Sequence, residues 1–306
     1  APLTRALVIG RQRKGRHIGA IVRDVRTALR AEGWRVESAL VISKKTLESR
    51  ARDAVRDGCE VVVAVGGDGA VVRAASAVAG TDASLGIIPT GTGNLLASNL
   101  GVPHGVRPAT RLIVRGRTRR IDMGRVTTDD GTRRDFAVAC GIGYDADVID
   151  ETGAGQKLRW GKLAYLANAV GQTGAIRNVA YTITLDGTTT EFEASQVFVA
   201  NFGKMLPLIE PRHRIVPDDG LLDVIVVRAS GPLPGLVATW EALRQKDLGQ
   251  TDGGHVFRAR ARKIEIKTEP SRLVESDGNS LGQTPIKIKV RPRTLRVIAP
   301  PPKCHP

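Results

Sequence analysis

The chain has 306 residues, which is enough for two compact cores. Its 42% hydrophobic and 25% charged residues are typical of a globular protein and exclude a disordered one. No apolar run reaches the length of a membrane-spanning helix, and the first residues show no secretory signal. The three cysteines, Cys59, Cys140 and Cys304, lie far apart without a metal-binding spacing, so we expect a reducing cytosol and neither disulfides nor zinc.

The net charge of +15 is the most unusual bulk property. Basic residues gather at positions 11–16, 115–120 and 258–263. Such a field attracts phosphates, nucleic acid or an anionic membrane surface, although solvated helix faces in an arginine-rich protein explain it equally well. Because only 4% of the residues are aromatic, the stacking surfaces of single-strand nucleic-acid binders are mostly missing, and we do not expect nucleic acid as a partner.

The first third of the chain alternates apolar runs with stretches of helical periodicity. The runs at 6–9, 36–42, 61–65 and 85–88 predict strands, and the stretches at 18–29, 47–55 and 71–78 predict helices. The run at 61–65 is continuously apolar and rich in valine, which is typical of a strand buried on both faces. This β-α repetition predicts a doubly wound parallel sheet that binds ligands at the carboxyl ends of its strands.

The pattern changes near Ile121. From there to about residue 285, short strands and aspartate–glycine turns predict an antiparallel β-sandwich-like domain, interrupted by a helix with an apolar stripe at 233–243. We therefore expect an α/β N-terminal domain over residues 1–122, to which residues 286–306 return, and a β-rich C-terminal domain over residues 123–285.

Two glycine-rich loops follow neighbouring predicted strands. The strand at 61–65 runs into Gly66-Gly67-Asp68-Gly69, and the strand at 85–88 runs into Pro89-Thr90-Gly91-Thr92-Gly93-Asn94. Glycines at a strand end allow a tight turn and let main-chain N–H groups at a helix N-terminus face an anion. The Asp68 carboxylate is placed to orient Mg²⁺ or a ribose. One such loop more often only connects two elements, but two side by side predict a nucleotide cradle.

Gly-Gly-Asp-Gly followed by Pro-Thr-Gly-Thr-Gly-Asn resembles the catalytic domain of the diacylglycerol kinase family, which includes sphingosine kinases and bacterial soluble lipid kinases. Four further motifs match in family order, at 141–146, 161–165, 217–223 and 276–278, so the resemblance covers most of the chain. NAD kinases share the glycine–aspartate motif, but the second loop and the Asp-Gly-Leu-Leu-Asp segment favour lipid kinases. The resemblance implies a first domain that binds nucleotide and a second that binds the lipid substrate.

The resemblance implies an ATP- and Mg-dependent kinase that transfers the γ-phosphate to the hydroxyl of a diacylglycerol-like lipid. It implies that Asp277 is the proton acceptor, a role that phosphoryl transfer requires, although Asp277-Gly278 alone reads as a hairpin turn. The implied ATP-binding residues are a hydroxyl after the second strand and the two loops: Ser43, Gly66, Gly67, Asp68, Gly69, Ala70, Val71, Val72, Arg73, Thr90, Gly91, Thr92 and Asn94.

The resemblance also implies a structural Mg²⁺, held by the Asp219 carboxylate and the backbone carbonyls of Val216 and Leu221. One carboxylate and two carbonyls are adequate for Mg²⁺, which prefers oxygen ligands and retains water. Without the resemblance, the same segment reads as a polar turn before a strand.

Four positions depart from the family pattern: Ala70 replaces a threonine, Val72 and Arg73 replace an asparagine–glutamate pair, and Asn279 replaces a glutamate. The basic segment 10–15 replaces an N-terminal phosphate loop, and its arginines and lysine are suited to hold phosphate. The alternatives are a lapsed kinase that binds nucleotide or lipid without turnover, and an NAD kinase-like enzyme.

The expected partners are ATP, a membrane lipid and an anionic membrane surface, with a cytoplasmic location at the inner face of the membrane. A homodimer is an open alternative. The acceptor stays open among diacylglycerol, sphingoid base, phosphatidylglycerol and other lipids, because the shape of the pocket selects the hydroxyl.

Overall fold

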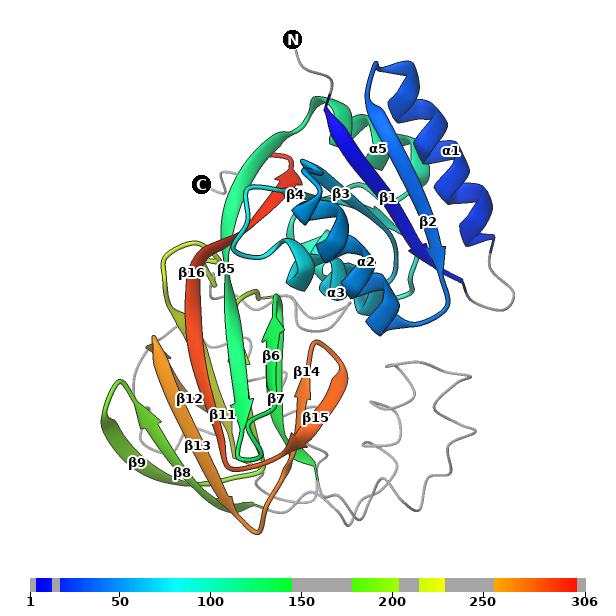
Figure 1. Ribbon diagram of the computed structural model, residues 1–306. Coiled ribbons are helices and arrows are strands. Elements are labelled where there is room, and N and C mark those ends of the chain that lie inside the picture. The colour runs from blue at the N-terminus through cyan, green and yellow to red at the C-terminus, as the bar shows by residue number, and fades with distance from the viewer. Residues whose placement is uncertain (1–3, 13–16, 145–177, 204–214, 229–255, 302–306) are drawn as a thin grey trace. The chain divides into compact units, whose positions relative to one another are not determined.

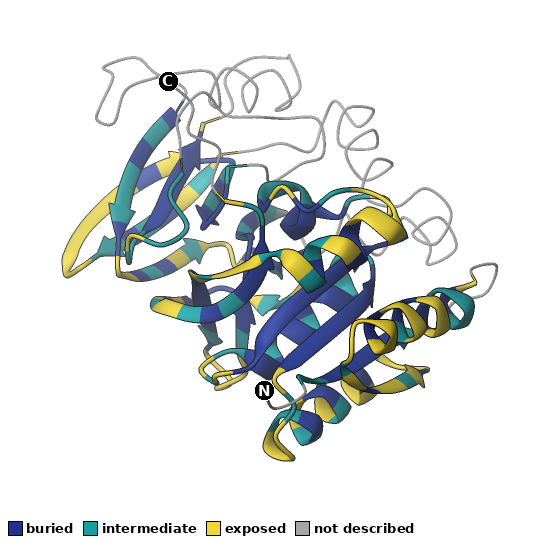
Figure 2. Cartoon of the chain, turned by 90° about the horizontal axis from the view of Figure 1, so that it is seen from above, coloured by how far each residue is buried: buried dark blue, intermediate teal, exposed yellow. Residues whose placement is uncertain are grey.

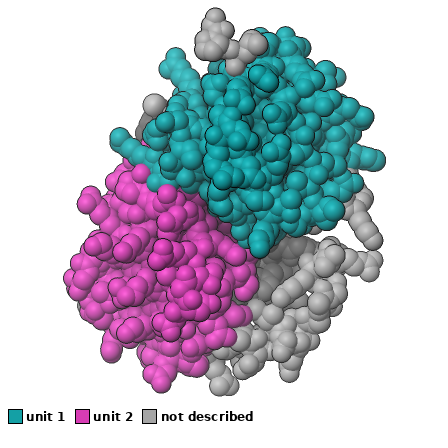
Figure 3. All heavy atoms as spheres, viewed as in Figure 1, with its two compact units in different colours: residues 1–122, 293–306 teal, residues 123–292 magenta. Residues whose placement is uncertain are grey.

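The structure, a computed structural model, describes residues 4–12, 17–144, 178–203, 215–228 and 256–301. These residues belong to two compact units, coloured separately in Figure 3: residues 1–122 with 293–306, and residues 123–292. The helix expected at 233–243, the motif at 161–165 and Cys304 lie outside the described residues. No helix in the described ranges is long and apolar enough to cross a membrane.

The first unit alternates strands and helices in chain order: β1 (Arg5–Arg11), α1 (Ile18–Ala31), β2 (Arg35–Val41), α2 (Lys44–Arg56), β3 (Val61–Gly66), α3 (Asp68–Val78), β4 (Ser84–Pro89), α4 (Leu95–Asn99) and α5 (Val106–Arg115). The strands form a parallel sheet in the order β2-β1-β3-β4 (Figure 1). The end of β16 (Ile286–Ala299) pairs in parallel with β4. Helices α1 and α5 pack together on one face, and α2 and α3 on the other (Figure 1).

Burial in this unit follows the sequence pattern. Every residue of β3 and of β4 is buried, and these strands form part of the dark blue centre of Figure 2. Helix α1 buries one face at helical spacing, with Val22, Val25 and Leu29 among its core residues. Helix α2 begins at Lys44, earlier than expected, because the Ser43 hydroxyl caps it by accepting a hydrogen bond from the Thr46 N–H at 3.0 Å. The predicted doubly wound α/β fold is confirmed.

The second unit contains mostly antiparallel strands: β5 (Arg117–Thr128, which begins in the first unit), β6 (Arg133–Phe136), β7 (Ala139–Tyr144), β8 (Val179–Leu185), β9 (Thr188–Ala194), β10 (Gln196–Ala200), β11 (Leu222–Val227), β12 (Val256–Ala261), β13 (Lys263–Glu269), β14 (Leu273–Ser276) and β15 (Asn279–Gln283). One sheet has the order β12-β11-β10-β7-β14-β15, and the other contains β9, β8, β13, β16, β5 and β6. A single hydrophobic cluster draws Val126 and Ile264 from one sheet and Ile142 and Val224 from the other. The two sheets therefore pack face to face, which confirms the predicted sandwich-like domain.

The division between the units falls inside two long strands, β5 and β16. The first boundary lies between Asp122 and Met123, and the second lies between Pro292 and Arg293, later than the expected position after residue 285. Strand β16 pairs with β13 near its start and with β4 near its end. The chain thus passes from one unit to the other without a turn, so no turn signal in the sequence could mark that boundary.

Candidate functional site

The two glycine loops touch each other at the carboxyl ends of β3 and β4. The strands are parallel neighbours with Gly66 opposite Pro89, and the Thr90 N–H donates to the Gly66 carbonyl at 3.0 Å. A Cβ atom on Gly91 would lie 2.5 Å from the Cα of Gly67, and one on Gly67 would lie 2.9 Å from the Cα of Gly91. Because backbone meets backbone here, both positions require glycine. The expected pair of adjacent loops is present.

Asp68 ties the first loop to the second. Its Oδ1 accepts a hydrogen bond from the Leu95 N–H at 2.5 Å, at the first residue of α4. Its Oδ2 lies 2.7 Å from the position of a Cβ on Gly93. The carboxylate therefore satisfies a helix N–H that has no partner within the helix, in addition to any role toward a ligand.

Asn94 closes the second loop on itself. It has the left-handed backbone conformation, with φ 46° and ψ 44°. Its buried side chain accepts from the Gly91 N–H at 2.9 Å and donates to the Gly91 carbonyl at 2.8 Å. Thr92, between these two residues, is exposed, and its hydroxyl has no hydrogen-bond partner among the residues that the structure describes. The loop thus presents Thr92 to solvent, whereas Asn94 stabilises the loop itself.

The remaining predicted ATP-binding residues of α3 face the protein. The side chains of Ala70, Val71 and Val72 are buried. The Arg73 guanidinium donates to Glu48 of α2 at 2.7 Å. Only the glycine turn and the first N–H groups of α3 therefore offer an open surface to an anion.

Lys44 is a residue of this site that the sequence reasoning missed. A Cβ on Gly69 would lie 2.8 Å from the Lys44 Cε and 3.0 Å from its Nζ, so the ammonium group lies over the first turn of α3. Ser43, the expected ATP contact beside it, caps α2. The available signal was a lysine three positions after the last residue of β2, because parallel strands end at the same edge of a sheet.

In the second unit, Asp277 is buried and tightly bonded. Its Oδ2 accepts from the Ala137 N–H at 2.7 Å, and its Oδ1 accepts from the N–H groups of Val138 and Ala139 at 2.9 and 3.0 Å. It has a positive φ of 45° at the turn between β14 and β15. Three N–H donors stabilise the charged carboxylate and fix its orientation. Asn201 supports the same segment by donating to the Ala137 carbonyl at 3.0 Å.

Asp219 has partners at both carboxylate oxygens. Its Oδ1 accepts from the Leu221 N–H at 3.1 Å, and its Oδ2 forms an ion pair with the Arg260 guanidinium. Within the described ranges, no group of three or more His, Cys, Asp or Glu side chains is placed to hold a metal ion. Because the only carboxylate of the implied ligand set is already paired with the Arg260 guanidinium, this segment does not fit the structural Mg²⁺ that the resemblance implies at Asp219, Val216 and Leu221.

Comparison with known proteins gives the family. The diacylglycerol kinase catalytic domain matches residues 5–126, and the YegS C-terminal NAD kinase beta sandwich-like domain matches residues 138–299. A diacylglycerol kinase of Mycobacterium tuberculosis is 30% identical over 255 residues, which cover 81% of this chain and 79% of that protein. The chain belongs to the diacylglycerol kinase family.

Two further similar proteins extend the comparison. Uncharacterized protein sll0036 of Synechocystis is 28% identical over 246 residues, which cover 80% of this chain but only 56% of that protein. The crystal structure of a putative diacylglycerol kinase from Bacillus anthracis superposes with a TM-score of 0.79 at 25% identity and covers 97% of each chain. The similarity to that solved structure thus extends over both units of this chain.

Proposed function

We propose that this diacylglycerol kinase family member is an ATP- and Mg-dependent kinase that transfers the γ-phosphate of ATP to a hydroxyl of a diacylglycerol-like lipid. The observation that carries the proposal is the backbone contact between the two glycine loops, beside the first turn of α3. Loops that only connect elements do not need glycine on both sides of a contact. A close pair of loops at a helix N-terminus suits a polyphosphate.

In this proposal the residues of the first unit bind and orient ATP. The N–H groups of the α3 first turn and the Lys44 ammonium hold phosphate oxygens, and the Thr92 hydroxyl contacts the nucleotide. Mg²⁺ bound together with ATP would neutralise charge on the phosphates. Asp277 accepts the proton of the lipid hydroxyl, whose oxygen bonds to the γ-phosphorus while the bond to ADP breaks.

A specific observation favours the second candidate, a lapsed kinase that binds nucleotide or lipid. Both implied aspartates carry structural bonds, Asp68 to the Leu95 N–H and Asp277 to three N–H groups. A protein without kinase turnover would still need Asp68 and Asp277 for these structural bonds.

One assay separates the candidates. The chain is incubated with Mg²⁺ and ATP labelled at the γ-phosphate, either with vesicles of a lipid extract or with NAD. Labelled lipid supports the proposed kinase, and identification of that lipid gives the acceptor. Labelled NADP would support the NAD kinase-like alternative. Retained ATP binding without any labelled product would favour the lapsed kinase.

We also propose that the chain works at an anionic membrane surface, because its acceptor is a lipid and its net charge is +15. Electrostatic docking of this kind brings the lipid hydroxyl to the enzyme without a spanning segment.

A further inference from the structure

A four-residue charge cluster lies where β11 and β12 pair. The strands are antiparallel, with Asp223 opposite Arg260 and Ile225 opposite Arg258. Since side chains alternate along a strand, Asp223, Arg258 and Arg260 share one face of the sheet. Asp219 reaches the same face from the turn before β11, where Gly220 has a positive φ of 78°. Two aspartates and two arginines are therefore brought together by the register of one strand pair.

Arg260 is the central member of this cluster. Its guanidinium pairs with Asp219 Oδ2, and its Nε lies 3.8 Å from Asp223 Oδ2. The side chains of Arg260 and Asp219 are 29% and 27% exposed, and that of Asp223 is 6% exposed. Burial raises the pKa of Asp223 to about 6, and the positive charges of Arg260 and Arg258 oppose this rise. The cluster is thus partly shielded from water, so the charges act on one another strongly.

We propose that Arg260 takes the place of the structural Mg²⁺ that the family resemblance implies at Asp219. The guanidinium supplies the positive charge that Asp219 needs and holds the turn at 218–220 against β12. With two acidic and two basic side chains, the cluster is already neutral. A divalent cation at Asp219 would be repelled by a guanidinium in direct contact with the same carboxylate.

The oxygen donors support the same conclusion. Mg²⁺ requires near-octahedral oxygen ligation and gives up its water reluctantly. Both Asp219 oxygens already have a partner, since one accepts the Leu221 N–H and the other binds Arg260, so a metal ion would have to share an oxygen with one of these donors. A bidentate-capable arginine is a suitable replacement, because its charge is permanent and its donors are fixed in a plane.

The test measures thermal stability without nucleotide or lipid, so its result is independent of the proposed kinase activity. For the wild-type chain, we expect the same melting temperature in EDTA and in millimolar Mg²⁺. Arg260→Met keeps the aliphatic stem and removes the charge, which leaves Asp219 and Asp223 close together without their shared arginine. We expect this variant to melt several degrees lower in EDTA and to regain part of the loss in Mg²⁺.

The matched control is Arg262→Met, which removes one exposed arginine just beyond β12. Like the wild-type chain, this variant should have the same melting temperature in EDTA and in Mg²⁺. A wild-type chain that Mg²⁺ stabilises, with the effect abolished by Asp219→Asn, would overturn the proposal. So would an Arg260→Met variant that folds and gains no Mg²⁺ response.

A second measurement serves if Arg260→Met does not fold. Mn²⁺ bound to the wild-type chain and to Asp219→Asn is counted by electron paramagnetic resonance. Equal counts support the replacement of the metal by Arg260. One Mn²⁺ fewer in Asp219→Asn would show that Asp219 ligates a metal in the presence of the arginine, and would refute the inference.

Discussion

At the scale of single residues, the two loops contain glycines with different neighbours. A side chain at Gly91 would meet the backbone of Gly67 at 2.5 Å, whereas one at Gly69 would meet the flexible end of Lys44 at 2.8 Å. Backbone cannot move without shifting β3 or β4, but a lysine end can rotate away. A side chain is therefore tolerated less well at Gly91 than at Gly69, although both glycines belong to the family motifs.

We expect Gly91→Ala to damage the loop pair and Gly69→Ala to affect mainly Lys44. Over-packing a rigid contact costs about 1–3 kcal/mol, so Gly91→Ala should lower the melting temperature and weaken ATP binding strongly. Gly69→Ala should keep the wild-type melt and weaken ATP binding only as much as displacement of Lys44 does. For each variant, calorimetric titration measures the affinity for ATP and a thermal melt measures the melting temperature. Wild-type ATP affinity in a folded Gly91→Ala variant would remove these loops from the site.

Lys44 gives the second prediction at this scale. A charge-assisted hydrogen bond contributes about 1.5–3 kcal/mol, so Lys44→Met should raise the dissociation constant for ATP roughly 10- to 100-fold. The matched control is Lys45→Met, which removes the neighbouring exposed lysine and should leave ATP affinity unchanged. If both variants bind ATP equally well, Lys44 is only a helix residue.

Asp277 gives the third. Asp277→Asn should reduce lipid phosphorylation by about 10²- to 10⁴-fold if the carboxylate is the general base. The substitution also places an NH₂ group against backbone N–H donors of residues 137–139, so we expect a lower melting temperature as well.

The control for Asp277→Asn is Asn201→Ala, which loosens the same segment by removing the bond to the Ala137 carbonyl. Initial rates are measured with saturating ATP and Mg²⁺, well below both melting temperatures. If Asn201→Ala loses as much activity as Asp277→Asn, the carboxylate acts through structure and the base must be sought elsewhere.

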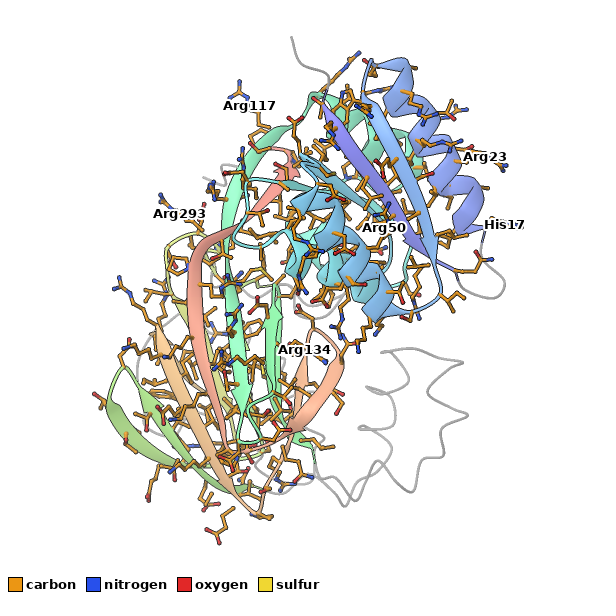
Figure 4. All side chains as sticks on the ribbon, in the orientation of Figure 1. His17, Arg23, Arg50, Arg117, Arg134 and Arg293 are labelled. Carbon is orange, nitrogen blue, oxygen red and sulfur yellow. The ribbon has the colours of Figure 1, made fainter. Side chains whose placement is uncertain are left out.

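At the scale of elements, α5 presents a row of positive charge. Arg107, Arg111 and Arg115 recur at every fourth position and are exposed, and the helix contains no acidic residue. These three arginines form no ion pair within the described part of the chain. Arg111 and Arg115 also line a hollow of about 640 Å³ with Leu112 and Pro300. Arg117, just after the helix, projects outward in Figure 4.

We expect α5 to carry much of the attraction to anionic membranes. Each arginine near such a surface adds about 1 kcal/mol, so replacing Arg107, Arg111 and Arg115 with alanine should strongly reduce co-sedimentation with phosphatidylglycerol vesicles at low salt. The control removes the same charge from separate exposed positions, Arg23, Lys45 and Arg133. Binding that is equal in both triple variants, or that persists on neutral vesicles at high salt, would contradict the assignment to α5.

At the scale of the whole molecule, β16 belongs to both units. Its last part contributes Leu295, Val297 and Ile298, all buried, to the first unit. Burial of an aliphatic side chain contributes about 1.5–3 kcal/mol, and three of them approach the total stability of a domain, about 5–15 kcal/mol.

We therefore expect a chain ending at Pro292 to lose the fold of its first unit. The lost strand would expose the edge of β4, and the unit should become sensitive to protease and prone to aggregate. A chain ending at Pro301 retains β16 and should melt like the full chain. A protease-resistant first unit in the shorter chain, with wild-type ATP binding, would show that the return of β16 is dispensable.

The sequence by itself determined the parts of this protein that depend on local pattern. The valine run of β3, the periodicity of α1 and the aspartate–glycine turns identified the α/β unit and the antiparallel unit, because burial repeats with the period of each element. It also identified both glycine loops, since a tight turn after a buried strand requires glycine.

Only the tertiary structure decided which side chains meet. Lys44 and Gly69 are distant in the chain, and they come together because α2 packs on α3. Arg260 reaches Asp219 through the register of β11 and β12. These two residues are far apart in the chain, and no local sequence pattern relates them. Asp277 has the sequence of a simple turn, and only the fold aims the N–H groups of residues 137–139 at its carboxylate. Sequence periodicity records burial within an element, whereas contacts between elements depend on packing that has no period.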